Sequence, residues 1–116
     1  MDVFHTEGAH LLVRAILALE TEAECRAFLE DLMTGKEIQD CSQRIMVAKL
    51  LREKKVYNRI AQETGASTAT ISRVNRCCAY GAGGYSAILD RIEGKEEDQP
   101  WNNPPSGGQM SAAGCG

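Results

Sequence analysis

The segment TGASTATISRVNR, residues 64–76, has an unusual composition for a helix. Its only sizeable apolar residues are Ile71 and Val74, and after Gly65 it carries four hydroxyl side chains: Ser67, Thr68, Thr70 and Ser72. Such a helix buries little apolar surface, so it adds little to the stability of a small domain. We therefore expect its outer face to contact a partner molecule.

The residues around this segment have the spacing of a helix-turn-helix, with helices predicted over 56–64 and 68–78. Ala61 provides the small side chain at which two helices can cross closely. Gly65, four residues later, tolerates the positive φ of a tight turn. Ile71 lies six residues beyond the glycine and can enter the corner between the helices. A plain helical hairpin inside a bundle is the alternative interpretation.

The second of these helices is predicted to separate an apolar inner side from a polar outer face. Val74 and Cys78 follow Ile71 at helical spacing and face inward, while Ser67 can cap the first amides. Short side chains would let this helix lie deep in a DNA major groove, which is about 12 Å wide. Hydroxyls can bond to base edges, and arginine can grip guanine. The predicted base contacts are Ser67, Thr68, Ala69, Thr70 and Arg73.

Charge is distributed unevenly along the chain. Residues 44–76 contain eight basic and two acidic side chains, which give this segment a net charge of +6. Because the whole chain has a net charge of −3, the remaining residues carry −9. A basic block in an acidic protein indicates local polyanion binding, although a solvated charged face has the same composition. The predicted DNA-phosphate contacts, which would fix the protein on the duplex, are Lys54, Lys55, Asn58, Arg59, Ser72 and Arg76.

Toward the amino terminus, apolar residues also follow a helical period, and no alternating strand pattern occurs. A first amphipathic helix is expected over about 11–19. Thr21 followed by Glu24 forms a capping box that predicts the start of a second helix. Gly35 is expected to end that helix in the left-handed conformation.

A third helix is predicted over about 37–53 and is apolar on more than one side. One face combines Ile38, Cys41, Ile45, Ala48 and Arg52. Further apolar surface around the cylinder comes from Met46, Val47, Leu50 and Leu51. This helix needs more cover than a small monomer easily provides, which favours a homodimer with a shared core, while a tightly wrapped monomer remains the alternative.

The carboxy-terminal part is predicted to contain one more helix, over about 86–92, after the glycine-rich AYGAGGY at 79–85. From Gly94 the composition turns polar and rich in proline and glycine. We therefore predict a helical domain over 1–94 and a disordered tail over 95–116, because the tail cannot form a core.

Several protein classes find no support in the composition. An odd count of five cysteines without secretory context argues against a disulfide framework. The adjacent Cys77 and Cys78 would point about 100° apart on a helix, which is poor geometry for zinc, so no metal site is expected. Without a signal peptide or an apolar run of about 20 residues, the chain is expected to be soluble and cytoplasmic, with no membrane partner.

Catalysis and nucleotide binding are likewise not indicated. His5 and His10 have no evident nucleophile or carboxylate partner, and Ser72 has no histidine nearby in the sequence. The GAGG run at 81–84 lacks the preceding strand and following Gly-Lys-Ser/Thr of a phosphate-binding loop. We expect no enzymatic activity and no cofactor.

The segment GASTATISRVNR, preceded by LLREKKVYNRIAQET and followed by YGAGGY, resembles the tryptophan-repressor superfamily, and more closely its YerC/YecD-type branch. The resemblance covers about Leu11 to Ile92, and ATISR is its most specific part. It implies an all-α fold of six helices and an intertwined homodimer. It also implies two recognition helices in successive major grooves of a near-palindromic operator.

The residues that hold the corepressor in that superfamily do not carry over completely. In tryptophan repressors two arginines sandwich the indole ring, and a glycine follows the second arginine. Arg73 matches the second arginine, whereas the first falls on Gln43, next to Arg44, and Val74 replaces the glycine. A possible effector pocket thus consists of Gln43, Arg44, Arg73 and Val74. L-tryptophan is a doubtful ligand for it, because Gln43 lacks the planar positive charge of an arginine and the Val74 side chain takes up space where the ligand would lie.

Taken together, the sequence predicts a transcriptional regulator, a repressor by analogy, that binds double-stranded DNA through a helix-turn-helix. One alternative is a helical dimeric adaptor that holds an acidic protein with the same basic face. Another is a helix-turn-helix that serves only within a larger recombinase-like or sigma-like assembly.

Overall fold

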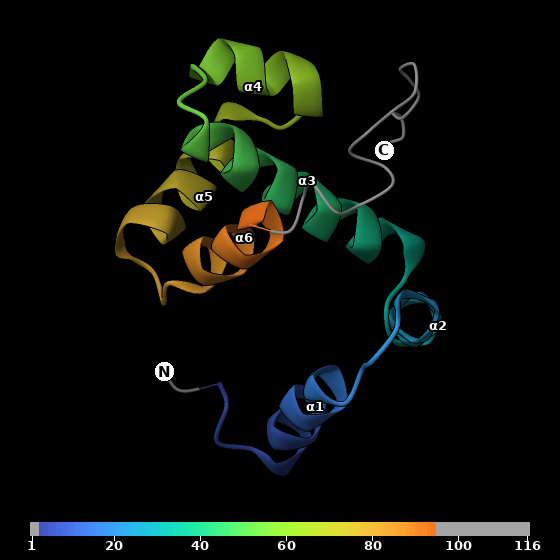
Figure 1. Ribbon diagram of the computed structural model, residues 1–116. Coiled ribbons are helices and arrows are strands. Elements are labelled where there is room, and N and C mark those ends of the chain that lie inside the picture. Colours follow the sequence, from blue (N-terminus) through green and yellow to red (C-terminus); the bar gives the residue numbers. More distant parts are fainter. Residues whose placement is uncertain (1–2, 95–116) are drawn as a thin grey trace. The chain divides into compact units, whose positions relative to one another are not determined.

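The computed structural model describes residues 3–94, and the predicted tail at 95–116 lies outside them. Within this range all regular structure is helical (Figure 1). The six helices are α1 (Glu7–Leu17), α2 (Glu22–Leu32), α3 (Gly35–Arg52), α4 (Tyr57–Thr64), α5 (Thr68–Tyr80) and α6 (Gly84–Gly94). The predicted all-α fold of six helices is confirmed.

Side-chain caps start the first two helices. The Thr6 hydroxyl oxygen accepts a hydrogen bond from the Ala9 N–H at 3.1 Å. The Thr21 hydroxyl oxygen accepts one from the Glu24 N–H, also at 3.1 Å. Each bond satisfies an amide that has no partner inside its helix. The predicted start of the second helix is confirmed.

The prediction that Gly35 ends the second helix is wrong. That helix ends at Met33, whose backbone is extended (φ −123°, ψ 153°), and Gly35 is already the first residue of α3. A second capping box begins α3 at once, because Glu37 N–H donates to the Thr34 hydroxyl at 3.1 Å and Thr34 N–H donates to the Glu37 carboxylate at 2.8 Å. The extended link therefore requires no left-handed residue.

The break between α5 and α6 is shorter than predicted, because the helices extend to Tyr80 and from Gly84. Glycine is required at two of the three intervening residues. A Cβ atom at Gly81 would lie 2.4 Å from the Cys77 carbonyl oxygen, and Gly83 has φ +87°. Close approach of the backbone and a left-handed conformation thus turn the chain within a short link.

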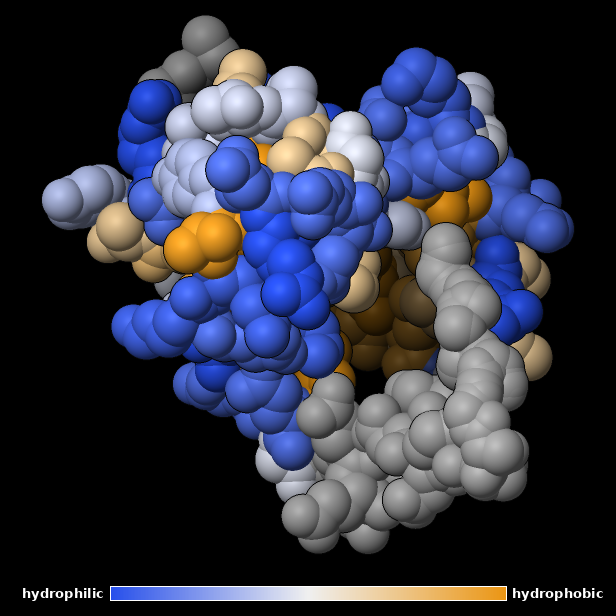
Figure 2. All heavy atoms as spheres, turned by 90° about the horizontal axis from the view of Figure 1, so that it is seen from above, coloured by the Kyte–Doolittle hydropathy of each residue, from blue (hydrophilic) through white to orange (hydrophobic). Residues whose placement is uncertain are grey.

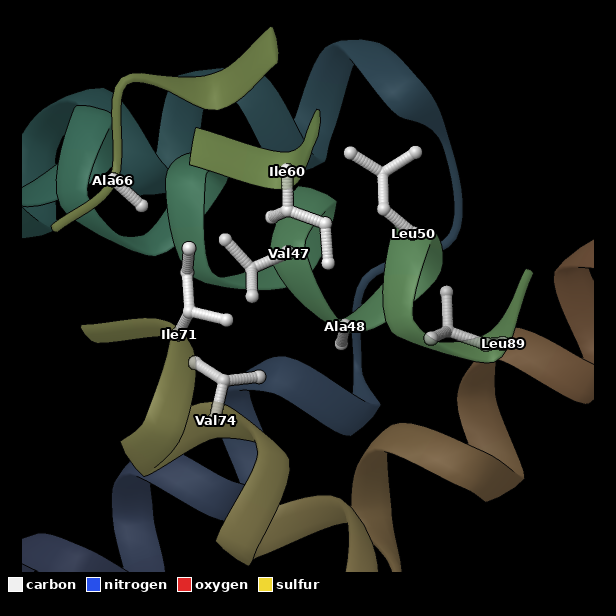
Figure 3. Close-up of a cluster of buried hydrophobic side chains, with 8 residues drawn as sticks. All are labelled: Val47, Ala48, Leu50, Ile60, Ala66, Ile71, Val74 and Leu89. Carbon is white, nitrogen blue, oxygen red and sulfur yellow. The ribbon is translucent and has the colours of Figure 1, made fainter. Parts of the chain in front are cut away.

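The chain divides into two compact units, one ending at Ile38 and the other beginning at Gln39, so the boundary falls inside α3. The carboxy-terminal unit has a closed apolar core, to which α3, α4, the following turn, α5 and α6 all contribute (Figure 3). Its buried members are Val47, Ala48, Leu50, Ile60, Ala66, Ile71, Val74 and Leu89.

The amino-terminal helices contain no buried residue. The large apolar side chains of α1 are exposed, from 38% at Leu12 to 77% at Leu17, whereas in α2 Phe28 and Leu29 are half-buried and Leu32 is 49% exposed. Both helices are nevertheless well capped and amphipathic. Within the amino-terminal unit itself these apolar faces enclose no core.

Candidate nucleic-acid interface

The turn between α4 and α5 has the geometry that the sequence predicts. Gly65 ends α4 in the left-handed conformation, with φ 75°, and its N–H donates to the Ala61 carbonyl at 2.8 Å. Ser67 is extended and accepts a hydrogen bond from the Thr70 N–H at 3.1 Å, which caps α5. The predicted roles of Gly65 and Ser67 in the helix-turn-helix are confirmed.

The inner side of this motif is closed. Ile60 and Ile71 are fully buried, and Val74 is 2% exposed. Partly buried Ala61 and Cys78 pack against the same core. Burial raises the pKa of the Cys78 thiol, and the neighbouring Cys77 adds to this shift. Cys78 therefore acts as a neutral, small apolar residue at the edge of the core.

The outer side of α5 presents the residues predicted to contact bases. Ser67, Thr68, Ala69 and Arg73 are exposed, and Thr70 is half-buried. The Ser67 hydroxyl also donates to the Thr70 hydroxyl oxygen at 3.1 Å. Because Ser67 is engaged as cap and donor, the Thr70 hydroxyl keeps its own proton for a partner outside the protein. The first turn of α5 is thus a fixed polar surface.

The basic residues of the segment 44–76 fall into two groups. One group forms ion pairs: Lys49 with Glu53 at 2.8 Å, Arg59 with Glu63 at 2.5 Å, and Arg52 with Asp90 and Glu93 of α6. In the part of the chain that the structure describes, the residues of the other group form no ion pair; this group consists of Arg44, Lys54, Lys55, Arg73 and Arg76. Four of these five were predicted DNA contacts.

The surface around α4 is polar. Asn58, Arg59, Gln62 and Glu63 of this helix are all exposed. The view from above, on the side where α4 lies in Figure 1, shows a predominantly hydrophilic face (Figure 2). Such a face suits a charged and hydrated partner better than an apolar one.

Lys54 has a backbone conformation that lysine rarely adopts. α3 ends in a Schellman motif, in which Lys55 N–H donates to the Leu50 carbonyl at 3.1 Å and Lys54 N–H donates to the Leu51 carbonyl at 3.0 Å. The left-handed residue of this motif is usually glycine. Here Lys54 occupies it with φ 66° and is the only non-glycine residue of positive φ within 3–94. Lys54 thus carries a backbone strain that glycine would avoid, and its exposed side chain lies just before α4.

Two of the four residues of the possible effector pocket are engaged within the fold, and the pocket itself stays a prediction. Val74 is buried in the core, and the Gln43 side-chain amide donates to the Thr64 carbonyl at 3.2 Å. Arg44 is exposed and its guanidinium lies 4.0 Å from the Cys41 sulfur. Over residues 3–94, no hydrogen bond links Arg73 to Gln43 or Arg44. Of these four residues, Gln43 and Val74 contact the helix-turn-helix from the inside, Gln43 through its hydrogen bond to Thr64 and Val74 as part of the core.

Sequence reasoning missed the contact of Arg52 with α6. Hydrogen bonds to Glu93 and Asp90 raise the pKa of the Arg52 guanidinium, so its positive charge is held against α6. The available signal was an arginine on a mostly apolar helix face together with two carboxylates one turn apart in the last helix. Arg52 thus links helices and is not a free DNA contact.

Comparison with known proteins gives consistent results. The family profile of the Trp repressor protein matches residues 7–93. The uncharacterized protein YerC of Bacillus subtilis (strain 168) is 49% identical over 100 residues, which cover 84% of this chain and 96% of YerC. None of the helices in the described range is long and apolar enough to cross a membrane.

Two solved structures are similar to the chain over most of their length. The crystal structure of a TrpR-like protein from Eubacterium eligens ATCC 27750 has a TM-score of 0.75 and 48% identity, covering 78% of this chain and 93% of that protein. A candidate Trp repressor from Staphylococcus aureus also has a TM-score of 0.75, with 45% identity, and the match covers 80% of this chain and 95% of that one. Sequence and fold comparisons thus both indicate proteins similar to the Trp repressor.

Proposed function

Because this chain belongs to the Trp repressor family, we propose that it is a sequence-specific DNA-binding transcriptional regulator, acting as a repressor. The observation that carries the proposal is the division of α5 into two sides. Its inner side is closed by Ile71 and Val74, whereas its outer side holds short polar side chains and two arginines, Arg73 and Arg76, that form no ion pair within residues 3–94. A helix with this division has its polar face available for a major groove.

Base recognition is assigned to the first half of α5. Thr70 offers a hydroxyl donor, the methyl groups of Thr68 and Ala69 can meet thymine, and Arg73 can bind guanine with two bonds. Ser67 lies at the start of the same surface, although its hydroxyl is already engaged in capping. Its contact with a base would therefore use a remaining lone pair.

Phosphate contacts are assigned to side chains around this surface. Lys54, Lys55 and Arg76 form no ion pair within 3–94, so their charges are available to the DNA backbone. Asn58 and Arg59 are exposed on α4, and Ser72 is half-buried on α5. Arg59 also forms an ion pair with Glu63, which lowers the contribution of Arg59 to phosphate binding. These contacts set position and affinity but not sequence preference.

A homodimer completes the proposal. The exposed apolar faces of α1 and α2 are complementary to a second copy of the same faces, and a two-fold dimer buries identical patches against each other. A dimer also places two recognition helices on half-sites about one helical turn apart, roughly 34–36 Å. The expected operator is therefore near-palindromic, and no small-molecule cofactor is required.

The proposal is tested by selecting bound fragments from a random duplex library at one stated salt concentration, with and without L-tryptophan. An enriched near-palindrome is the expected result. Absence of enrichment in both conditions would instead favour an adaptor that binds acidic proteins.

Arg73→Ala and Lys55→Ala then separate base contacts from phosphate contacts. Arg73→Ala should narrow the difference between the selected and a scrambled duplex by about 1 to 3 kcal/mol. Lys55→Ala should weaken binding to both duplexes equally and reduce the slope of log K against log salt by about 0.9. If the two variants behaved alike on both duplexes, the assignment of roles would be wrong.

A further inference from the structure

A side-chain hydrogen bond connects α3 with the end of α4, across 21 residues of sequence. The Gln43 amide Nε2 donates to the Thr64 carbonyl oxygen at 3.2 Å, and both residues are partly buried. Thr64 is the last residue of α4, immediately before the left-handed Gly65. The bond therefore meets the helix-turn-helix at its turn.

The Thr64 carbonyl is one of the last carbonyls of α4, which have no partner within the helix. Gly65 N–H turns back to the Ala61 carbonyl and leaves that of Thr64 open. Gln43 therefore caps α4 from another helix. The Thr64 hydroxyl in turn donates to the Ile60 carbonyl at 2.8 Å and accepts from the Ala66 N–H at 3.1 Å. Three hydrogen bonds thus meet at this residue.

The turn is also held from its inner side. Ala66 is 5% exposed and belongs to the same core as Val47 of α3 and Ile71 of α5 (Figure 3). Ser67, the cap of α5, follows Ala66 directly. A shift of Thr64 would consequently move the first turn of α5, which carries the proposed base contacts.

We propose that Gln43 is a positioning residue, which holds the helix-turn-helix against α3 in its DNA-binding geometry, so that DNA binding requires no small-molecule ligand. This inference rests on the proposed function. The protein's own amide provides the link between α3 and the turn, and Val74 fills the adjoining core. The orientation of α5 is thereby set when the chain folds.

The test compares Gln43→Met with Gln39→Met in the full-length protein on the selected duplex. Methionine has a similar length to glutamine, carries no charge and cannot donate to the Thr64 carbonyl. Gln39 is exposed one turn earlier on the same helix, so its exchange is the matched control. Gln43→Met should weaken binding about three- to tenfold for each subunit that contacts the duplex, as expected for the loss of one hydrogen bond in that subunit. Amide exchange at Gly65 and Ala66 should be faster, whereas Gln39→Met should match the wild type.

A pH series on Gln43→Glu tests whether the hydrogen-bond donor at residue 43 is what DNA binding requires. The ionised carboxylate repels the Thr64 carbonyl, but the protonated acid can donate to it as the amide does. Its affinity relative to wild type should therefore be low at about pH 7.5 and recover as the pH falls toward about 5, because partial burial beside a carbonyl oxygen raises the pKa of a carboxyl above its ordinary value of about 4.3. If Gln43→Met does not fold, the pH series on Gln43→Glu is the test of the proposal. A DNA affinity that stays low as the pH falls overturns the role of Gln43.

The outcomes separate this inference from the proposed function. A wild-type protein that enriches no duplex would remove the function itself. A wild-type protein that binds a selected duplex, with Gln43→Met equal to Gln39→Met, would overturn only the role of Gln43. A requirement for added L-tryptophan would overturn the claim that binding is ligand-free.

Discussion

The two units of this chain differ in how their apolar residues are used. From Gln39 onward, eight apolar residues form a closed core around the helix-turn-helix. In α1 and α2 no residue is buried, although α1 contains the run LLVRAIL. Apolar composition is therefore not a measure of burial. The helix-turn-helix closes its core with its own chain, whereas the amino-terminal unit encloses no core of its own.

This difference has an energetic meaning. Each Å² of apolar surface removed from water contributes about 25 cal/mol, so the faces of α1 and α2 are an unused source of stability. A second copy supplies matching faces, whereas DNA, with its phosphate charges, does not. In the proposed function, dimerisation therefore belongs to the amino-terminal helices and DNA binding to the helix-turn-helix. The following substitutions test this division.

The largest effect is expected in the closed core. Ile60→Ala should lower the free energy of unfolding by about 2 to 5 kcal/mol, because Ile60 is fully buried and alanine leaves a cavity. Val56 lies just before α4 and is 68% exposed. Val56→Ala should therefore change the free energy of unfolding by less than about 0.5 kcal/mol. Urea unfolding monitored by circular dichroism measures both. Equal losses would contradict the closed core.

The next effect concerns the amino-terminal faces. Ile16 is 51% exposed, so Ile16→Asp would be harmless in a monomer. If a second copy covers α1, the buried carboxylate should instead weaken the dimer by about 1 to 3 kcal/mol. Analytical ultracentrifugation over a range of concentrations measures the dissociation constant of the dimer. The control is His10→Asp, a change on the exposed polar side of α1. Identical association of both variants and the wild type would refute the assignment.

Lys54→Gly should change stability and DNA affinity in opposite directions. Glycine relieves the left-handed strain, so the free energy of unfolding should rise by about 1 kcal/mol. Loss of the ammonium group should weaken binding to all duplexes and reduce the salt slope by about 0.9. Lys55→Ala, which carries no such strain, is the control and should show only the second effect. Unchanged DNA affinity in Lys54→Gly would remove Lys54 from the interface.

The smallest effect is expected from Glu63→Gln on α4. The change releases Arg59 from its ion pair and removes a negative charge beside the proposed DNA face. Binding to selected and scrambled duplexes should tighten by about 0.2 to 1 kcal/mol, with a steeper salt dependence. Stability should change by less than about 0.5 kcal/mol, because the pair is exposed. Fluorescence anisotropy at two salt concentrations detects this, and unchanged binding would argue against Arg59 as a phosphate contact.

Much of the helix-turn-helix could be predicted because its determining contacts are local. The Gly65 turn, the Ser67 cap and the inward Ile71 depend on residues within a few positions of one another. The error at Gly35 has a local cause as well, since Thr34 and Glu37 start α3 before a left-handed residue is needed. The helical period also predicted that the outer α5 residues face away from the core. Their contacts with DNA stay predictions.

The sequence by itself determined the helical period, the caps, the turn and the basic segment, because each depends on residue types at short spacing. Tertiary structure decided which charges and amides are engaged. Gln43 reaches Thr64 across 21 residues, and Arg52 reaches Asp90 across 38. Such contacts depend on how helices cross and on the core between them, and no short spacing encodes that geometry.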